Sequence, residues 1–96
     1  MPALPAGWFT VDGPLEASKF ENELHREMPP GHELFGQKVK LLAKRERKDD
    51  FLFEISDGRV ARVHLTWAVE TDPFWPSSLV YASVYDWAAE ENADGA

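Results

Sequence analysis

The spacing of apolar residues changes once along this chain, and the change limits the folds open to it. Between residues 14 and 28 apolar side chains recur every three or four positions, which is the period of a helix with one buried face. Pro29-Pro30-Gly31 ends that pattern, because proline cannot continue a helix. After residue 38 apolar and polar residues alternate, as in a half-buried strand. The sequence therefore predicts an N-terminal amphipathic helix followed by a sheet. The apolar stripe of the helix consists of Ala17, Phe20, Leu24 and Met28.

Four segments supply the expected strands. They cover residues 38–44, 51–55, 60–67 and 79–82. A helix that precedes such a run of strands is typical of the α+β class. We therefore expect the helix to pack on a four-stranded, mainly antiparallel sheet in a two-layer sandwich. The side chains expected to face the helix are Val39, Leu41, Ala43, Phe51, Phe53, Ile55, Ala61, Val63, Leu65 and Trp67.

The connection between the second and third segments fixes their register. A two-residue turn at Asp57-Gly58 would place the two apolar stripes on opposite faces of the sheet. A three-residue loop over 56–58 instead sets Phe53 opposite Ala61, which aligns the stripes. The sequence thus predicts a type I turn with a G1 bulge and a positive φ at Gly58.

Two alternatives are open after residue 82. Ser83 followed by Asp86 is a capping pattern that predicts a short C-terminal helix over 84–91, packed through Trp87. The alternative is that the fourth strand continues through Tyr85. Residues 1–96 are expected to form one domain, with an extended N-terminal arm over 1–11 and a loose tail over 92–96.

Composition excludes several classes of protein. The chain has no cysteine, so disulfides, thiolate metal sites and a cysteine nucleophile are excluded. Its formal net charge of −7 argues against binding to nucleic acid or to anionic membranes. Residues 1–8 lack the basic flank and the apolar run of a secretory signal. We therefore expect a cytoplasmic protein with neither nucleic acid nor membrane as partner.

The charge is unevenly distributed. Residues 38–62 carry eight basic and five acidic side chains, while both flanks are acidic. Lys40, Arg62 and His64 fall on the polar side of the predicted strands, which we expect to be an open sheet face. A basic, partly aliphatic face suits an acidic protein partner or a second copy of the chain. The leading prediction is therefore a non-catalytic binding or protein-interaction module that uses this face.

A second prediction places a pocket at the next loop. Trp67 and Trp75 are eight residues apart, and together they would line an apolar site for a small molecule. The polar contacts of a small-molecule binder or a modest enzyme at this site would come from His64, Thr66 and Asp72. A third prediction is an immunity or antitoxin-like inhibitor that meets a basic toxin through the acidic flanks.

The sequence contains no catalytic or metal-binding motif. No triad order or Gly-x-Ser-x-Gly pattern is present, so no catalytic residue is assigned. His25, His32 and Glu33 lack the spacing of a metal site, and no cofactor is predicted. Asp49-Asp50 are interpreted as turn residues, because adjacent residues do not share a face of a strand.

Part of the chain resembles a known family. Gly31-His32-Glu33-Leu34, the strand that begins at Asp49, His64-Leu65-Thr66-Trp67 and Trp75-Pro76 together resemble a family of small bacterial proteins of unknown function. The resemblance extends from about residue 23 onward. It implies a stand-alone bacterial domain in the cytosol and carries no activity or site residue.

Overall fold

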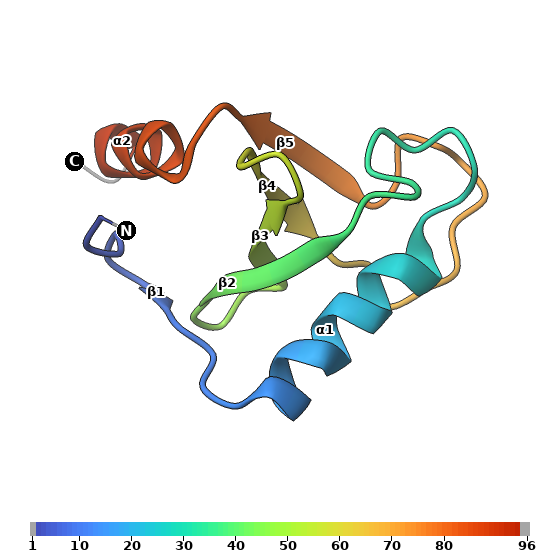
Figure 1. The fold of residues 1–96 in the computed structure, drawn as a ribbon, viewed down its shortest axis with the longest axis horizontal. Helices are drawn as coiled ribbons and strands as arrows, with labels where there is room; N and C mark the ends of the chain where they lie inside the picture. Colours follow the sequence, from blue (N-terminus) through green and yellow to red (C-terminus); the bar gives the residue numbers. More distant parts are fainter. Residues whose placement is uncertain (1, 95–96) are drawn as a thin grey trace.

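The computed structural model describes residues 2–94 and contains two helices and a five-stranded antiparallel sheet (Figure 1). Neighbouring strands in the sheet follow each other along the chain. The α+β class is confirmed, but the sheet has five strands instead of four, because two residues of the predicted N-terminal arm pair with the next strand. The elements are β1 (Trp8–Phe9), α1 (Pro14–Glu27), β2 (Val39–Arg45), β3 (Asp50–Ile55), β4 (Val60–His64), β5 (Ser77–Tyr81) and α2 (Val84–Asp94).

Helix α1 forms where the helical period predicts it. Pro14 occupies its first turn, where a missing N–H costs no hydrogen bond. On its exposed side Arg26 donates two hydrogen bonds to Glu23, at 3.0 and 2.6 Å. The helix ends at Glu27, directly before Met28, Pro29 and Pro30.

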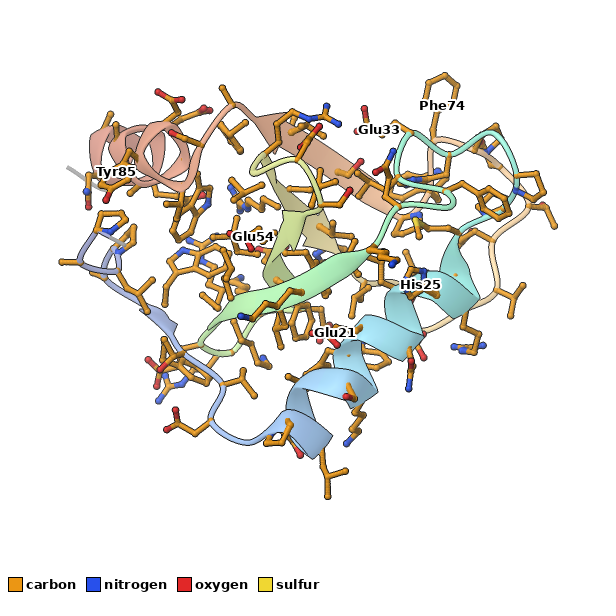
Figure 2. All side chains as sticks on the ribbon, viewed as in Figure 1. Glu21, His25, Glu33, Glu54, Phe74 and Tyr85 are labelled. Carbon is orange, nitrogen blue, oxygen red and sulfur yellow. The ribbon has the colours of Figure 1, made fainter. Side chains whose placement is uncertain are left out.

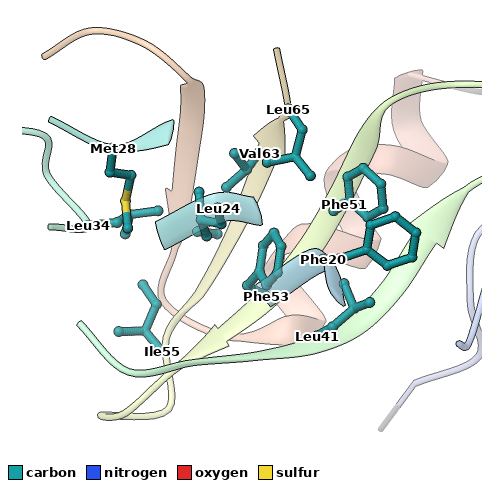
Figure 3. Close-up of a cluster of buried hydrophobic side chains, with 11 residues drawn as sticks. Phe20, Leu24, Met28, Leu34, Leu41, Phe51, Phe53, Ile55, Val63 and Leu65 are labelled. Atoms are coloured by element: carbon teal, nitrogen blue, oxygen red, sulfur yellow. The ribbon is translucent and has the colours of Figure 1, made fainter. Parts of the chain in front are cut away.

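The first hydrophobic core lies between α1 and the sheet (Figure 3). Phe53 and Val63 both belong to it, so the apolar stripes of β3 and β4 face the helix as predicted. Full burial of one such side chain contributes about 1.5–3 kcal/mol, so this core stabilises both the helix and the sheet. Its members are Phe20, Leu24, Met28, Leu34, Leu41, Phe51, Phe53, Ile55, Ala61, Val63 and Leu65.

A β-bulge in β2 changes which side of the sheet its residues face. Leu41 lies opposite Phe53, but Ala43 lies opposite Leu52, so the register shifts between these two pairs. An extra residue in one strand reverses the alternation beyond it. Ala43 therefore faces away from α1, and the prediction that it shares a face with Leu41 is wrong.

Helix α1 also satisfies a backbone group beside the bulge. The Oε2 atom of Glu21 accepts a hydrogen bond from the Leu41 N–H at 2.8 Å. A bulge disrupts the ladder locally, and a buried N–H without a partner is costly. This contact therefore ties the helix to the strand at the point where the strand changes face.

The face of the sheet opposite α1 carries a second hydrophobic core. Trp87 of α2 packs edge-on against Trp8 of β1, with ring centroids 5.0 Å apart. The sequence predicted that this face is open. That prediction is wrong for the part beneath α2 and the N-terminal arm. The two-layer prediction is wrong for the same reason, because a helix packs on each face. The second core consists of Trp8, Ala43, Leu52, Val60, Trp87 and Ala88.

The hairpin between β3 and β4 has the predicted register. Phe53 pairs with Ala61, the Gly58 N–H donates to the Ile55 carbonyl at 3.0 Å, and the φ of Gly58 is 91°. The Ile55 N–H donates to the Arg59 carbonyl at 2.8 Å. This pattern is that of a three-residue loop with a G1 bulge, as the alignment of the apolar stripes requires.

Strand β4 ends earlier than predicted. It stops at His64, and Trp67 adopts a φ of 60°, outside the extended region. Trp67 is 45% exposed, so it is not the last buried position of the strand. Leu65 keeps the alternation and is buried in the first core.

Helix α2 confirms the C-terminal helix and excludes the strand alternative. The Ser83 hydroxyl accepts from the Asp86 N–H at 3.2 Å, as the capping pattern predicts. Residues 92–94 continue this helix instead of forming a tail, while residues 95 and 96 lie outside the described residues. Within residues 2–94, no helix has the length and apolar character needed to cross a membrane.

We expect Gly58→Ala to lower the free energy of unfolding by about 1–2 kcal/mol, because an L side chain disfavours a positive φ. An added Cβ would meet no atom within 4 Å, so the backbone conformation alone sets the cost. Urea unfolding followed by tryptophan fluorescence measures the change. Gly58→Asn is the control and should cost less, because asparagine tolerates left-handed conformations. Equal stability of wild type and Gly58→Ala would contradict the assigned turn.

Candidate functional site

A buried carboxylate organises the polar part of the face opposite α1. Asp50 begins β3, and its side chain is 12% exposed. Its oxygens lie 2.8 Å from His64 Nδ1, 3.3 Å from Arg62 Nη2 and 3.5 Å from Arg45 Nη1. An ionised carboxylate only accepts hydrogen bonds, so His64 Nδ1 carries the hydrogen and points at Asp50. The interpretation of Asp50 as a turn residue is therefore wrong.

These partners keep Asp50 ionised. Burial alone would raise the pKa of Asp50, but the hydrogen bonds from His64 and Arg62 and the charge of Arg62 outweigh it and lower the pKa below its usual 3.8. A depressed carboxyl pKa contributes stability that is present above the unfolded value and is lost as the pH falls. The cluster is thus intact at neutral pH.

Arg62 is held in place by structural contacts. Its Nη1 donates to Glu91 of α2 at 2.7 Å, and its guanidinium lies 5.9 Å from the centroid of the Trp8 ring. Together with the bond to Asp50, these contacts link β4 to β3 and to α2. Arg62 therefore has a structural role through its ion pairs with Asp50 and Glu91, and replacing it would disturb the fold.

A shallow hollow of about 210 Å³ opens beside this cluster. The His64 side chain is 53% exposed there, and its Nδ1 is the ring nitrogen that contacts Asp50. Among the described residues, no hydroxyl donates a hydrogen bond to its Nε2. The arrangement orients an imidazole without pairing it with a nucleophile, which favours binding over nucleophilic chemistry. The hollow is lined by Asp50, Arg62, His64, Ser77 and Leu79.

Lys40 lies apart from this hollow. It is exposed and sits opposite Glu54, at the other end of the sheet face. It lines a separate, open groove beside the β3–β4 turn that includes Gly58. The structure therefore does not bring Lys40 together with Arg62 and His64.

The hydrogen-bond pattern of β4 shows which backbone groups of β5 are free. Ile55 N–H donates to the Arg59 carbonyl and Leu65 N–H to the Asp49 carbonyl, at the two ends of the β3–β4 ladder. Bonded and non-bonded pairs alternate in an antiparallel ladder, so every second residue of β4 directs its backbone at β3. The alternate residues of β4 direct their backbone N–H and C=O groups at β5. These residues are Val60, Arg62 and His64.

The same alternation continues in β5. The residues opposite those three direct their N–H and C=O groups at β4, whereas Ser78 and Val80 direct theirs away from the sheet. Within residues 2–94, no backbone group of another segment bonds to Ser78 or Val80 on that side. We call these outward groups the free edge of β5. The inward residues are Ser77, Leu79 and Tyr81.

Large apolar side chains flank the free edge. Leu79, in the middle of β5, is 54% exposed. Phe74 and Trp75 lie just before the strand, and Phe74 is 84% exposed and points away from the body of the protein (Figure 2). Tyr85 is exposed on α2, just after the strand. Exposed apolar groups gathered along one element are typical of a contact surface.

Trp67, one of the two residues of the predicted pocket, packs beside the first core. The ring contacts of Trp67 are with Phe20 and Phe51, at 6.2 and 6.4 Å between centroids. Four hollows of the described residues are lined by other side chains, and a shared Trp67 and Trp75 pocket stays a prediction. A hollow of about 310 Å³ lies nearby instead, lined by Gly31, Glu33, Pro73 and Phe74.

Asp72 shapes its own loop. Its side chain accepts from the Phe74 N–H at 2.9 Å, and its carbonyl accepts from the Trp75 N–H at 3.0 Å. Such contacts are typical of an Asx turn. Asp72 therefore positions the two aromatic residues that precede β5.

Thr66 and Trp67 are bound to a carboxylate that the sequence analysis did not single out. Glu27 is fully buried at the end of α1. It accepts from the backbone N–H of Thr66 and of Trp67, each at 2.8 Å, and from the Thr66 hydroxyl at 3.0 Å. Burial raises the pKa of Glu27 to about 7, the adjacent Glu23 adds to the rise, and the N–H donors oppose it.

His32 holds two loops together. Its Nδ1 accepts from the Leu34 N–H, so its Nε2 carries the hydrogen and donates to the Pro76 carbonyl at 2.7 Å. This bond joins the loop after α1 to the residue before β5. Among the described residues, no cluster of three or more His, Asp and Glu side chains is arranged for a metal ion.

Asp50, Glu27 and the free edge of β5 are the features that sequence reasoning missed. Asp50 stands beside a second acidic residue in a charged turn, so its type and position favour a solvated role. Glu27 falls at the end of a helix rich in charged residues. No signal in the sequence separates either residue from its exposed neighbours.

Comparison with known proteins adds no identification. No family model matches the chain, and no similar protein is found among curated proteins or solved structures. The resemblance carried by residues 64–67 and 75–76 stays a prediction. We therefore infer the function of this chain from its geometry.

We expect the stability of the protein to fall as the pH rises from about 4.5 to about 7, because of Glu27. Its carboxyl keeps a proton in the folded state that the unfolded state, with the usual pKa of 4.5, has already released. Stability decreases with pH wherever the folded state binds more protons. Chemical unfolding of wild type and Glu27→Gln across this range measures the effect.

Relative to wild type, Glu27→Gln should gain stability with rising pH and level off above about 7. Glu16→Gln, an exposed position on the same helix, controls for the change in net charge. A constant difference between wild type and Glu27→Gln across the range would show that Glu27 does not titrate there.

Proposed function

We propose that this protein is a non-catalytic protein-interaction module that receives its partner along the free edge of β5. The observation that carries the proposal is the pair of outward backbone groups at Ser78 and Val80, beside an exposed Leu79. An added strand would complete these hydrogen bonds and cover the leucine. Strand addition at a sheet edge is a common mode of protein recognition.

The composition of β5 supports this use. Natural proteins protect sheet edges with charged residues, proline or very short strands. The other edge strand, β1, has only two residues. Strand β5 has five residues and contains neither charge nor proline, so it lacks these protections. A sheet edge without charge or proline can pair with a strand of another chain.

The surroundings of β5 offer specificity. On the face opposite α1 the strand borders the hollow that contains His64 and Arg62. At its start, Phe74 and Trp75 provide exposed aromatic surface of the kind enriched at protein interfaces. The proposed binding surface thus includes His64 and Arg62 from the predicted sheet face and Trp75 from the predicted pocket. Its centre is the edge of β5 and not the face of the sheet.

A small-molecule binder or modest enzyme is the second candidate. The hollow of about 310 Å³ beside Phe74 favours it, since its size falls at the lower end of ligand pockets. Tryptophan fluorescence titrated with a metabolite library tests this candidate, because Trp75 lies next to Phe74. The inhibitor hypothesis stays a prediction that the neighbouring genes would test.

We expect a photoreactive amino acid at position 79 to crosslink to a protein in cells that produce this chain. The same amino acid at position 15, where Leu15 is fully exposed on α1, is the matched control and should crosslink far less. Mass spectrometry of the adducts gives the measurement and identifies the crosslinked protein.

Val80→Pro provides the test of backbone pairing. It removes an outward N–H without breaking a bond to β4, so a folded variant is expected. Loss of one hydrogen bond, worth about 1 kcal/mol, should reduce crosslinking by at least about fivefold. Equal yields at positions 79 and 15, or yields unaffected by Val80→Pro, would contradict the proposal.

A further inference from the structure

We infer that the partner at the free edge of β5 is a second copy of this chain, paired antiparallel about a two-fold axis at Leu79. The inference rests on the proposed function and names its partner. The two sheets would join into one continuous antiparallel sheet.

The backbone of β5 is complementary to itself. Ser78 and Val80 are the outward residues, and they stand symmetrically on either side of Leu79. A two-fold axis at Leu79 sets Ser78 of one copy opposite Val80 of the other, as a hydrogen-bonded pair. Leu79 then faces its own copy in a non-hydrogen-bonded pair, where side chains approach most closely. No shift of register is needed to satisfy all four outward residues of the two strands.

The side chains of β5 allow this pairing. Leu79 is 54% exposed in a strand that is otherwise small or half-buried, and its copy would cover it. Ser77 would lie opposite Tyr81 at both ends. Because β5 itself has no charged residue, no two like charges of the strands lie opposite each other, and the nearest carboxylate is that of Glu33, which accepts a hydrogen bond from the Ser78 hydroxyl.

The start of helix α2 would extend the contact beyond the strand. Helix α2 begins at Val84, three residues after β5, and packs on the face that carries the hollow. An antiparallel partner places its own Tyr81 end beside Ser77, next to His64. The exposed first turn of the partner's helix would carry Tyr85 and Asp86 to the rim of the hollow. The partner's helix end thus meets a rim where His64 is exposed, whereas Arg62 is already paired with Asp50 and Glu91.

The size of the contact sets the expected affinity. A single pair of five-residue strands with one flanking helix turn buries less than the standard interface of about 1,600 Å². We therefore expect a reversible dimer with a dissociation constant on the order of 100 µM. Such a dimer is monomeric at low concentration and assembles as the concentration rises.

Sedimentation equilibrium of the full chain from about 10 µM to 1 mM tests the inference. Wild type should shift from monomer to dimer across this range. Leu79→Glu should weaken association by at least about tenfold, because it sets two carboxylates against each other at the axis and removes apolar contact. Leu15→Glu, the same substitution at another exposed leucine, should associate as wild type does.

A second measurement covers the case in which Leu79→Glu alters the fold. Amide hydrogen exchange of wild type should show protection at Ser78 and Val80 that increases with protein concentration, while the amides of β4 stay unchanged. Leu79→Ser, a smaller change, should show an intermediate shift in sedimentation.

Each outcome decides between the two proposals. Wild type that stays monomeric to 1 mM, or dimers that Leu79→Glu does not weaken, would overturn the pairing of two copies. If position 79 then crosslinks to a different protein, the interaction module stands with another partner. If position 79 crosslinks to nothing, both proposals fail.

Discussion

The bulge in β2 is the constraint on which the rest of the structure depends. Without it, regular alternation would turn Ala43 toward α1 and Lys44 toward the opposite face. The extra residue between Leu41 and Ala43 turns Ala43 toward Leu52 on the far side. There it meets Trp8 and Trp87 in a second core, which requires cover from α2 and β1. The bulge thus adds Ala43 to a second buried face, which Leu52 and Val60 of the neighbouring strands also form.

Two buried carboxylates extend this arrangement to the loops. Glu27 at the end of α1 binds the backbone that follows β4, and Asp50 at the start of β3 binds the side chains of β4. Glu27 is the last residue of α1 and Asp50 is the first residue of β3. Each carboxylate accepts hydrogen bonds in addition to those between the strands. They differ in charge state, because Asp50 has cationic partners that lower its pKa whereas burial raises that of Glu27 to about 7. The same functional group, a carboxyl, is therefore a fixed anion at Asp50 and a proton binder at Glu27.

The elements predictable from the sequence are those that local rules determine. The register of the 56–58 loop follows from the alignment of two apolar stripes, and the cap of α2 follows from Ser83 and Asp86. The bulge was not predictable, because an alanine fits either face and the regular alternation of residues 39–43 masks the extra residue. Asp50 was missed for a different reason. Its partners lie 5, 12 and 14 residues away, and only the completed sheet brings them together. Among the predicted site residues, the structure keeps Arg62 and His64 adjacent but separates Lys40 from them.

Helix α1 covers one face of the sheet and α2 covers part of the other, which limits where a partner can bind. A sheet with one open face presents a broad surface, and the sequence analysis placed its docking site there. The unsatisfied backbone hydrogen-bonding capacity of the described sheet lies along its two edges, and β1 is too short to offer much of it. Strand β5 then combines free backbone groups, an exposed Leu79 and the absence of charge in one continuous segment. A solvated edge of this kind is a liability for a protein that acts alone, because it is open to pairing with any extended chain. The lack of charge and proline in β5 is therefore the physical basis of the proposed partner binding.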